Sequence, residues 1–151
     1  MILRNADLQD LPTLLTLSYQ MFSQTPMSRH CKFSPEQMAS TLISLIQSST
    51  GSVLVTENSG EIIGLALVTI EQSYFSSQRV AKELGVYVHP DHRVSGAGLA
   101  LLRHFKQWSL AKQADLIEVG NIANIIDSDR YEKVLSRLGL KHSGNIYEMR
   151  L

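Results

Sequence analysis

The sequence predicts an α/β fold with one mixed sheet and helices on both faces of that sheet. Strand-like and helix-like segments follow one another in the order β, α, α, β, β, β, α, β, α, β, which favours a sheet covered by helices. A turn at residues 58–60 separates two apolar runs, as in a hairpin. An apolar run at residues 80–88 leads through a short polar loop and two glycines into a long amphipathic helix.

The first third of the chain is predicted to be a strand followed by two helices. Residues 2–4 form a short apolar strand, and Asp7 can cap a helix whose apolar residues keep helical spacing. Ser34 and Pro35 mark the start of a second helix, because Ser caps well and Pro suits the first helical position. The polar stretch between the helices, at about residues 23–33, is predicted to be irregular.

The rest of the chain supplies five strands and two helices. The runs at 52–56 and 61–68 form the hairpin, and a third strand covers about 80–88. The helix after the loop has an apolar stripe made by Ala97, Leu101, Phe105 and Trp108. We then expect a strand at 116–119, a helix that is capped by Asp127 or Ser128 and ended by Gly139, and a last strand at 146–149.

Length and composition limit the classes of protein to consider. The 151 residues suit a single domain spanning residues 1–151. Lys and Arg number 14, as do Asp and Glu, so no basic surplus indicates nucleic-acid binding. Cys31 is the only cysteine, which excludes an intrachain disulfide and a cysteine metal cluster and suits a reducing, cytoplasmic location. We see neither a signal peptide nor a run long enough to cross a bilayer.

The most informative stretch is the strand, loop and helix start at residues 86–99. Unpaired N–H groups at a helix start, together with the helix dipole, favour an anion there. Gly96 and Gly98 leave room for a phosphate, and Arg93 adds a cation. The Gly-Lys-Ser/Thr of nucleotide P-loops is absent, and Leu101 stands where a dinucleotide fingerprint needs its third glycine. The pattern therefore predicts a pyrophosphate-binding loop of a different type from these two. The alternative is a plain strand–turn–helix whose glycines allow close packing.

The spacing Arg93-x-x-Gly96-x-Gly98 resembles the acetyl-CoA loop of the GNAT-type N-acetyltransferases, which follows Arg/Gln-x-x-Gly-x-Gly/Ala. The element order is similar to that fold as well, which implies a central sheet of about six or seven strands. Residues 88–90 and 138–140 agree with the resemblance, so it spans nearly the whole chain. The sequence of residues 95–102 is especially similar to that of small acetyltransferases from phages and prophages.

The resemblance implies an enzyme that transfers an acetyl group from acetyl-CoA to a primary amine by direct attack, without a metal. In that family two parallel strands splay apart and the pantetheine arm lies between them. The backbone N–H of Val88, or of a neighbour such as Tyr87, would stabilise the oxyanion. The residues that would hold the pyrophosphate are Arg93, Val94, Ser95, Gly96, Ala97, Gly98 and Leu99.

Glu83 is the leading candidate for the base that deprotonates the amine, since it lies on the strand that leads to Val88. Strict alternation puts Glu83, Gly85 and Tyr87 on one face of the sheet. The family's base falls nearer Lys82 in a gap-free count, so this role requires an irregular strand. The alternative is that Glu83 is a solvated strand residue. His89 and His142 are weaker candidates.

Two departures from the family pattern bear on catalysis. Leu135 stands where the family often has a Tyr that protonates the departing thiolate. Tyr131, one helical turn earlier on the same face, either replaces it or serves as half-buried packing. Val94 stands where close relatives often have Gly, and it would be strained if the loop needed a positive φ there.

Asn121 and Asn124 either bind the pantetheine amides or form a turn.

The acceptor side is expected to involve residues 23–33, either as the lining of a selective pocket or as ordinary packing between helices. Its candidate lining residues are Met21, Phe22, Met27, Arg29, His30, Cys31 and Phe33. The acceptor is a primary amine that the sequence does not identify, and the fold is compatible with a homodimer. Two other functions remain open: a coenzyme A-binding module that has lost its chemistry, as Leu135 suggests, and acyl transfer to a protein or nucleic acid.

Overall fold

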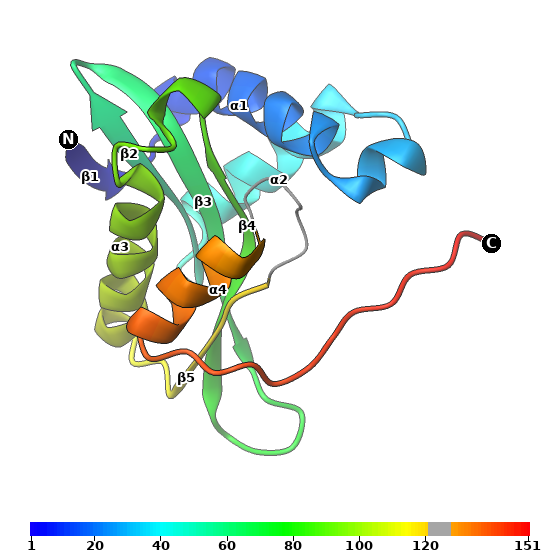
Figure 1. Ribbon diagram of the computed structural model, residues 1–151, viewed down its shortest axis with the longest axis vertical. Coiled ribbons are helices and arrows are strands. Elements are labelled where there is room, and N and C mark those ends of the chain that lie inside the picture. Colours follow the sequence, from blue (N-terminus) through cyan, green and yellow to red (C-terminus); the bar gives the residue numbers. More distant parts are fainter. Residues whose placement is uncertain (121–127) are drawn as a thin grey trace.

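The computed structural model, which describes residues 1–120 and 128–151, has a mixed sheet as predicted (Figure 1). The strands of the described residues are β1 (Ile2–Asn5), β2 (Gly51–Asn58), β3 (Glu61–Gln72), β4 (Arg79–Val88) and β5 (Leu116–Glu118). They lie in the order β1-β2-β3-β4-β5. Neighbouring strands are antiparallel except β4 and β5, which are parallel. The described residues thus form five strands, fewer than the six or seven expected.

Helices cover both faces of the sheet, as the sequence predicts (Figure 1). The helices are α1 (Leu11–Ser23), α2 (Pro35–Gln47), α3 (Ala97–Ala111) and α4 (Ser128–Arg137). One buried cluster packs α1 and α2 against alternate strand residues such as Val55 and Leu65. A second packs α3 against the intervening residues, Leu54 and Ala66 among them. Because successive side chains of a strand point to opposite faces, the strands contribute to two hydrophobic cores, one on each face of the sheet.

Local signals fix the start of the first two helices. The hydroxyl of Ser34 accepts a hydrogen bond from the backbone N–H of Gln37 at 3.2 Å, as its predicted capping role requires. Asp7 also caps as expected, because its side chain accepts from the backbone N–H of Gln9 at 2.8 Å. The element that Asp7 caps is a short 3-10 turn at Leu8–Asp10, after which α1 begins at Leu11.

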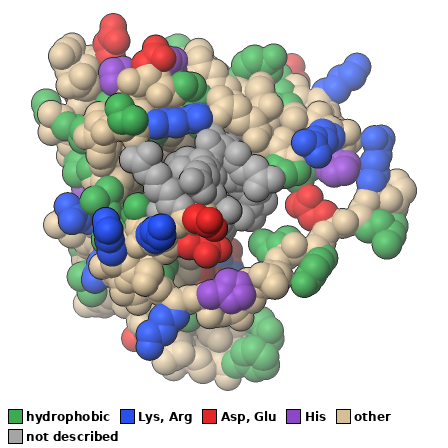
Figure 2. Space-filling view, viewed as in Figure 1, with side chains coloured by type: hydrophobic (Ala, Val, Ile, Leu, Met, Phe, Trp, Pro, Cys, Tyr) green, Lys and Arg blue, Asp and Glu red, His purple; other side chains and the backbone are tan. Residues whose placement is uncertain are grey.

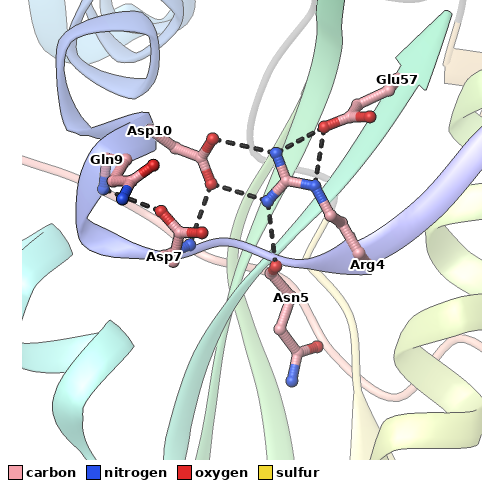
Figure 3. Close-up of polar contacts among 6 residues, drawn as sticks. All are labelled: Arg4, Asn5, Asp7, Gln9, Asp10 and Glu57. Carbon is pink, nitrogen blue, oxygen red and sulfur yellow. Dashed lines mark hydrogen bonds and ion pairs between the residues drawn. The ribbon is translucent and has the colours of Figure 1, made fainter. Parts of the chain in front are cut away.

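Arg4 ties the first strand to the start of α1 and to β2 (Figure 3). Its two terminal nitrogens donate to the carboxylate of Asp10 at 2.7 and 2.9 Å, and its Nε donates to Glu57 at 2.7 Å. Arg4 thereby lowers the pKa of Asp10, while Asp10 and Glu57 raise the pKa of Arg4. Arg4 is thus paired with two carboxylates, and these contacts hold β1 at the edge of the sheet.

A bulge at Leu84 interrupts the alternation of β4. Gly85 pairs with Leu67 and Glu83 pairs with Val68, so Leu84 has no partner on β3. Glu83 therefore lies on the face of Val68, which is the face that α3 covers. Strict alternation, which grouped Glu83 with Gly85 and Tyr87, was wrong because the extra residue shifts the pattern by one.

The strand predicted at residues 146–149 is absent. Residues 140–151 form no helix or strand, and they run away from the body of the molecule (Figure 1). The side chains of Ile146, Tyr147 and Met149 are 67%, 89% and 84% exposed. The sequence here is suited to a strand, but a strand needs a partner edge, and the described part of the chain supplies none to it.

Candidate functional site

β4 and β5 pair over only three residues, and we call the unpaired edge of β4 beyond this pairing the gap. Val80, Ala81 and Lys82 pair with the three residues of β5, whereas β4 continues to Val88. Within residues 1–120 and 128–151, the rest of β4 therefore has no strand partner on that side. Such a gap between two parallel strands is what the predicted binding of a pantetheine arm requires.

The peptide of Val88 faces this gap. The N–H of His89 donates to the carbonyl of Ile63 on the β3 side at 2.8 Å. Because polar groups alternate along an antiparallel strand, Tyr87 also directs its backbone groups towards β3, and Val88 directs its own the other way. The carbonyl of Val88 accepts from Nε of Arg93 at 3.1 Å. Of the two residues proposed from the sequence, Val88 is thus the one whose N–H points into the gap.

The loop after β4 ends in an N-terminus of α3 that is open to solvent. Gly96 has a φ of +85°, and a Cβ placed on it would meet nothing within 4 Å. The hydroxyl of Ser95 accepts from the N–H of Ala97 at 3.3 Å, and the helical hydrogen bonds start with the N–H of Ala100 donating to Gly96 at 3.0 Å. The N–H groups of Gly98 and Leu99 thus have no acceptor one helical turn back within α3. This geometry fits a phosphate.

Val94 is not strained in this loop. Among the described residues other than glycine, a positive φ occurs only at Ser59 and Gln113, and the left-handed turn of the loop falls on Gly96. The side chain of Val94 is 83% exposed. A β-branched residue is therefore compatible with the loop.

Arg93 braces the loop against α1. Its guanidinium donates to the side-chain oxygen of Gln24 at 2.6 Å as well as to Val88, and it lies 5.7 Å from the ring centre of Tyr87. The hydroxyl of Tyr87 in turn donates to Gln20 at 3.3 Å and accepts from Gln24 at 3.4 Å. Sequence reasoning missed Gln20 and Gln24, although their spacing of four places two amides on one face of a helix.

Glu83 and Tyr131 come together beside the gap. One carboxylate oxygen of Glu83 accepts from the backbone N–H of Gly120 at 3.1 Å. Burial raises the pKa of Glu83 to about 7, and the Gly120 N–H partly opposes this. On α4, burial and then the charge of Glu83 raise the pKa of the Tyr131 hydroxyl. The irregular strand that Glu83 needed is present, as the bulge at Leu84.

The other candidate titratable groups lie elsewhere. Lys82 forms an ion pair with Glu71 at 2.6 Å and lies 4.0 Å from Glu118. His89 lies 3.7 Å from Asp91, and an exposed His142 is hydrogen-bonded to Asn145 at 3.0 Å. The predicted roles of Asn121 and Asn124, and the cap at Asp127, lie outside the described residues.

The segment predicted to line the acceptor side packs against β4. A Cβ on Gly85 would lie 3.2 Å from the thioether of Met21, so the end of α1 touches the strand that carries Val88. Phe33 packs its ring against Tyr19 at 5.3 Å and Phe22 at 5.5 Å. Cys31 is exposed.

A family model described as the acetyltransferase (GNAT) family matches residues 14–130. The chain belongs to the GNAT acetyltransferase family. The resemblance inferred from the loop is therefore confirmed, and so is the mixed α/β fold class. No curated protein sequence matches the chain.

Several solved structures share the GNAT fold with this chain. AAC(6')-IG, an aminoglycoside 6'-N-acetyltransferase from Acinetobacter haemolyticus, is 17% identical over 100% of this chain and 98% of its own, with a TM-score of 0.73. AAC(6')-Iy, in complex with a bisubstrate analogue of coenzyme A, is 18% identical over 99% and 97%, with a TM-score of 0.76. A ribosomal-protein-alanine N-acetyltransferase from Brucella melitensis biovar Abortus 2308 is 16% identical over 100% of both chains, with a TM-score of 0.74. At these identities the likeness shows the fold.

The described residues contain neither a metal-binding cluster nor a membrane-spanning helix. No group of three or more His, Cys, Asp and Glu side chains in them is arranged to hold a metal ion. None of their helices is both long and apolar enough to cross a membrane.

Proposed function

We propose that this GNAT protein is an N-acetyltransferase that transfers the acetyl group of acetyl-CoA to a primary amine by direct attack. The observation that carries the proposal is the position of the Val88 N–H. It faces the gap between β4 and β5, with the open start of α3 on one side and Glu83 farther along the same strand. A donor aimed at the gap is what an oxyanion formed from a thioester needs.

The loop residues fit coenzyme A by their chemistry. The N–H groups of Gly98 and Leu99 and the space beside Gly96 suit the pyrophosphate. Arg93 contributes by holding the carbonyl of Val88, which fixes the orientation of the neighbouring peptide. When bound, acetyl-CoA supplies the activated acetyl group as a thioester.

Glu83 would act as the base. With a pKa of about 7, about half of its carboxyl groups are ionised at neutral pH, and the conjugate acid forms readily. It takes a proton from the amine as the nitrogen attacks the thioester carbonyl. The carbon–sulfur bond then breaks, and the thiolate leaves with the electron pair.

Tyr131 would return a proton to the thiolate. While Glu83 is charged, it helps to keep the pKa of Tyr131 high, and the hydroxyl holds its proton. Once Glu83 carries the proton from the amine, that charge is gone and the hydroxyl donates more easily. The phenolate then regains a proton from Glu83, which returns both groups to their starting states.

One observation favours a second candidate function, a module that binds coenzyme A without catalysing transfer. Leu135 on α4 is half-buried and has no proton to give. In that case Tyr131 would only pack beside Glu83.

The single domain over residues 1–151, the cytoplasmic location and the homodimer remain predictions from the sequence.

The proposal is tested by calorimetric binding of acetyl-CoA together with thiol release over a panel of amines. We expect binding and amine-dependent release. Gly98→Glu should abolish detectable binding, because a carboxylate would occupy the phosphate site, whereas the matched surface variant Gly60→Glu in the β2–β3 turn should bind normally. Binding without release would favour the second candidate. Normal binding by Gly98→Glu would overturn the assignment of the pyrophosphate-binding loop.

A further inference from the structure

The connection between α1 and α2 is positively charged in a chain that is neutral as a whole. Residues 11–35 contain Arg29, His30 and Lys32 and have neither Asp nor Glu, although acidic and basic residues each number 14 in the chain. All three side chains are exposed. Among the described residues, no carboxylate forms an ion pair with any of the three side chains. Lys, Arg and His side chains stand at the upper right of Figure 2, where Figure 1 has this connection.

This segment is joined directly to the strand that faces the gap. Gln24, the residue after α1, accepts from Arg93 at 2.6 Å, and Arg93 also holds the carbonyl of Val88. Met21 packs beside Gly85 on β4. The start of this segment therefore contacts both β4 and the loop that follows it.

The same segment carries aromatic surface. Phe33 packs against Tyr19 and Phe22, and Tyr19 remains 55% exposed, so part of a ring is available to a ligand. Met27, on the turn between the helices, is 47% exposed. Aromatic and thioether groups bind apolar side groups well.

We propose that the acceptor is an amine that also carries a carboxylate and an apolar or aromatic group, which is the chemistry of an amphipathic amino acid. This inference rests on the proposed transfer to an amine and adds the class of acceptor. Arg29 and Lys32 attract the carboxylate, and the ring of Tyr19 contacts the apolar group. The same two cations repel a polycationic acceptor such as an aminoglycoside.

The test compares phenylalanine, phenylalaninamide and kanamycin as ligands of the protein saturated with coenzyme A, by calorimetry at low salt. Phenylalaninamide has an uncharged carboxamide in place of the carboxylate, and its α-amine is less basic. We expect phenylalanine to bind at least about tenfold more tightly than the amide, and kanamycin to bind more weakly than both. Equal or tighter binding of the amide or of kanamycin overturns the inference, as does a failure of phenylalanine to bind.

Matched variants assign the effect to this segment. The double variant Arg29→Gln/Lys32→Gln should lose about tenfold in affinity for phenylalanine and nothing for the amide. The control Arg103→Gln/Lys106→Gln removes two exposed cations from α3 and should bind like the parent protein. An equal loss in both double variants would mean that total charge, and not this segment, selects the ligand, and would overturn the inference.

Thiol release with acetyl-CoA on the same ligands separates this inference from the proposed function. Preference for phenylalanine in binding, without release, would support the inference about the ligand and contradict the proposed transfer. A kcat/KM, expressed per neutral amine, that is higher for the amide or for kanamycin than for phenylalanine would support the transfer and contradict the inference.

Discussion

The two strands that border the gap are held in very different ways. β4 is ten residues long, pairs along β3 and has helices packed on both faces, so Tyr87 and Val88 are only 2% and 7% exposed. β5 has three residues, and its Leu116 is 50% exposed. The groups proposed to bind coenzyme A and the oxyanion belong to the firmly held side. Gly120 and Tyr131, which set the environment of Glu83, belong to the lightly held side, so binding and chemistry depend on parts of unequal stability.

The largest expected effect is on the rate of acetyl transfer, when Glu83, which lies on β4 and contacts Gly120 after β5, is replaced. Glu83→Gln should lower kcat/KM by about 10²- to 10⁴-fold while the Kd for acetyl-CoA changes little, because the amide cannot accept the proton of the amine. In the parent protein the rate should rise with pH up to about 7 and then level off, since the base is active when ionised. An unchanged rate in the variant would remove Glu83 from the mechanism.

The same carboxyl makes stability depend on pH. Its pKa is about 7 in the folded protein against a reference value of 4.5, so between these values the folded state keeps a proton that the unfolded state has lost. Stability should therefore fall as the pH rises from 4.5 to about 7. Urea unfolding at several pH values should show a smaller fall for Glu83→Gln, and an identical fall would contradict the assigned pKa.

A pair of core substitutions tests the difference in stability directly. Leu101 on α3 is fully buried against the sheet, and Leu101→Ala should cost about 2–5 kcal/mol of unfolding free energy. Leu116→Ala on β5 should cost less than about 1 kcal/mol, because half of that side chain is already in solvent. Similar losses, measured by urea unfolding, would mean that β5 is held as firmly as the rest of the sheet.

Two glycines with nearly the same positive φ distinguish backbone strain from loss of ligand binding. Gly96 in the loop and Gly60 in the β2–β3 turn have φ values of +85° and +84°, and both have open space around a Cβ. Alanine at either position should cost about 1 kcal/mol of stability, from the left-handed backbone. Only Gly96→Ala should also weaken acetyl-CoA binding in calorimetry. Equal binding by the two variants would contradict a role for the space beside Gly96.

The smallest effect is expected at the end of the chain. Removal of residues 142–151 should change the free energy of unfolding by less than about 1 kcal/mol, because its large apolar side chains are exposed. Urea unfolding of the shortened protein measures this. A loss of several kcal/mol would mean that the segment packs on the body in solution.

Prediction from the sequence succeeded where the signal is local and failed where it depends on a partner. The cap at Ser34, the apolar stripe of α3 and the turn at Ser59–Gly60 each follow from neighbouring residues. The bulge at Leu84 depends on pairing with β3, although a glycine beside it, Gly85, is a signal that could have raised the possibility. The pattern at 146–149 favours a strand, but no local pattern specifies an edge to receive it.

For the candidate site, the turn into α3 could be predicted because it depends on a local signal, the glycine at position 96 that adopts a positive φ. The position of Tyr131 near Glu83 was not predicted, since it depends on how α4 packs beside the sheet. The brace formed by Gln24 and Arg93 joins positions 69 residues apart, and no spacing pattern connects them.

The extra residue at Leu84 has a consequence for comparing distant relatives. Because Leu84 has no partner on β3, the position of Glu83 differs by one residue depending on whether it is counted along β4 from the loop or along β3 from Leu67. An ungapped alignment with a chain that lacks this bulge would match Glu83 with the wrong neighbour. In this fold the equivalent of Glu83 is better found as the residue opposite Val68 than as a fixed number of residues before Gly96.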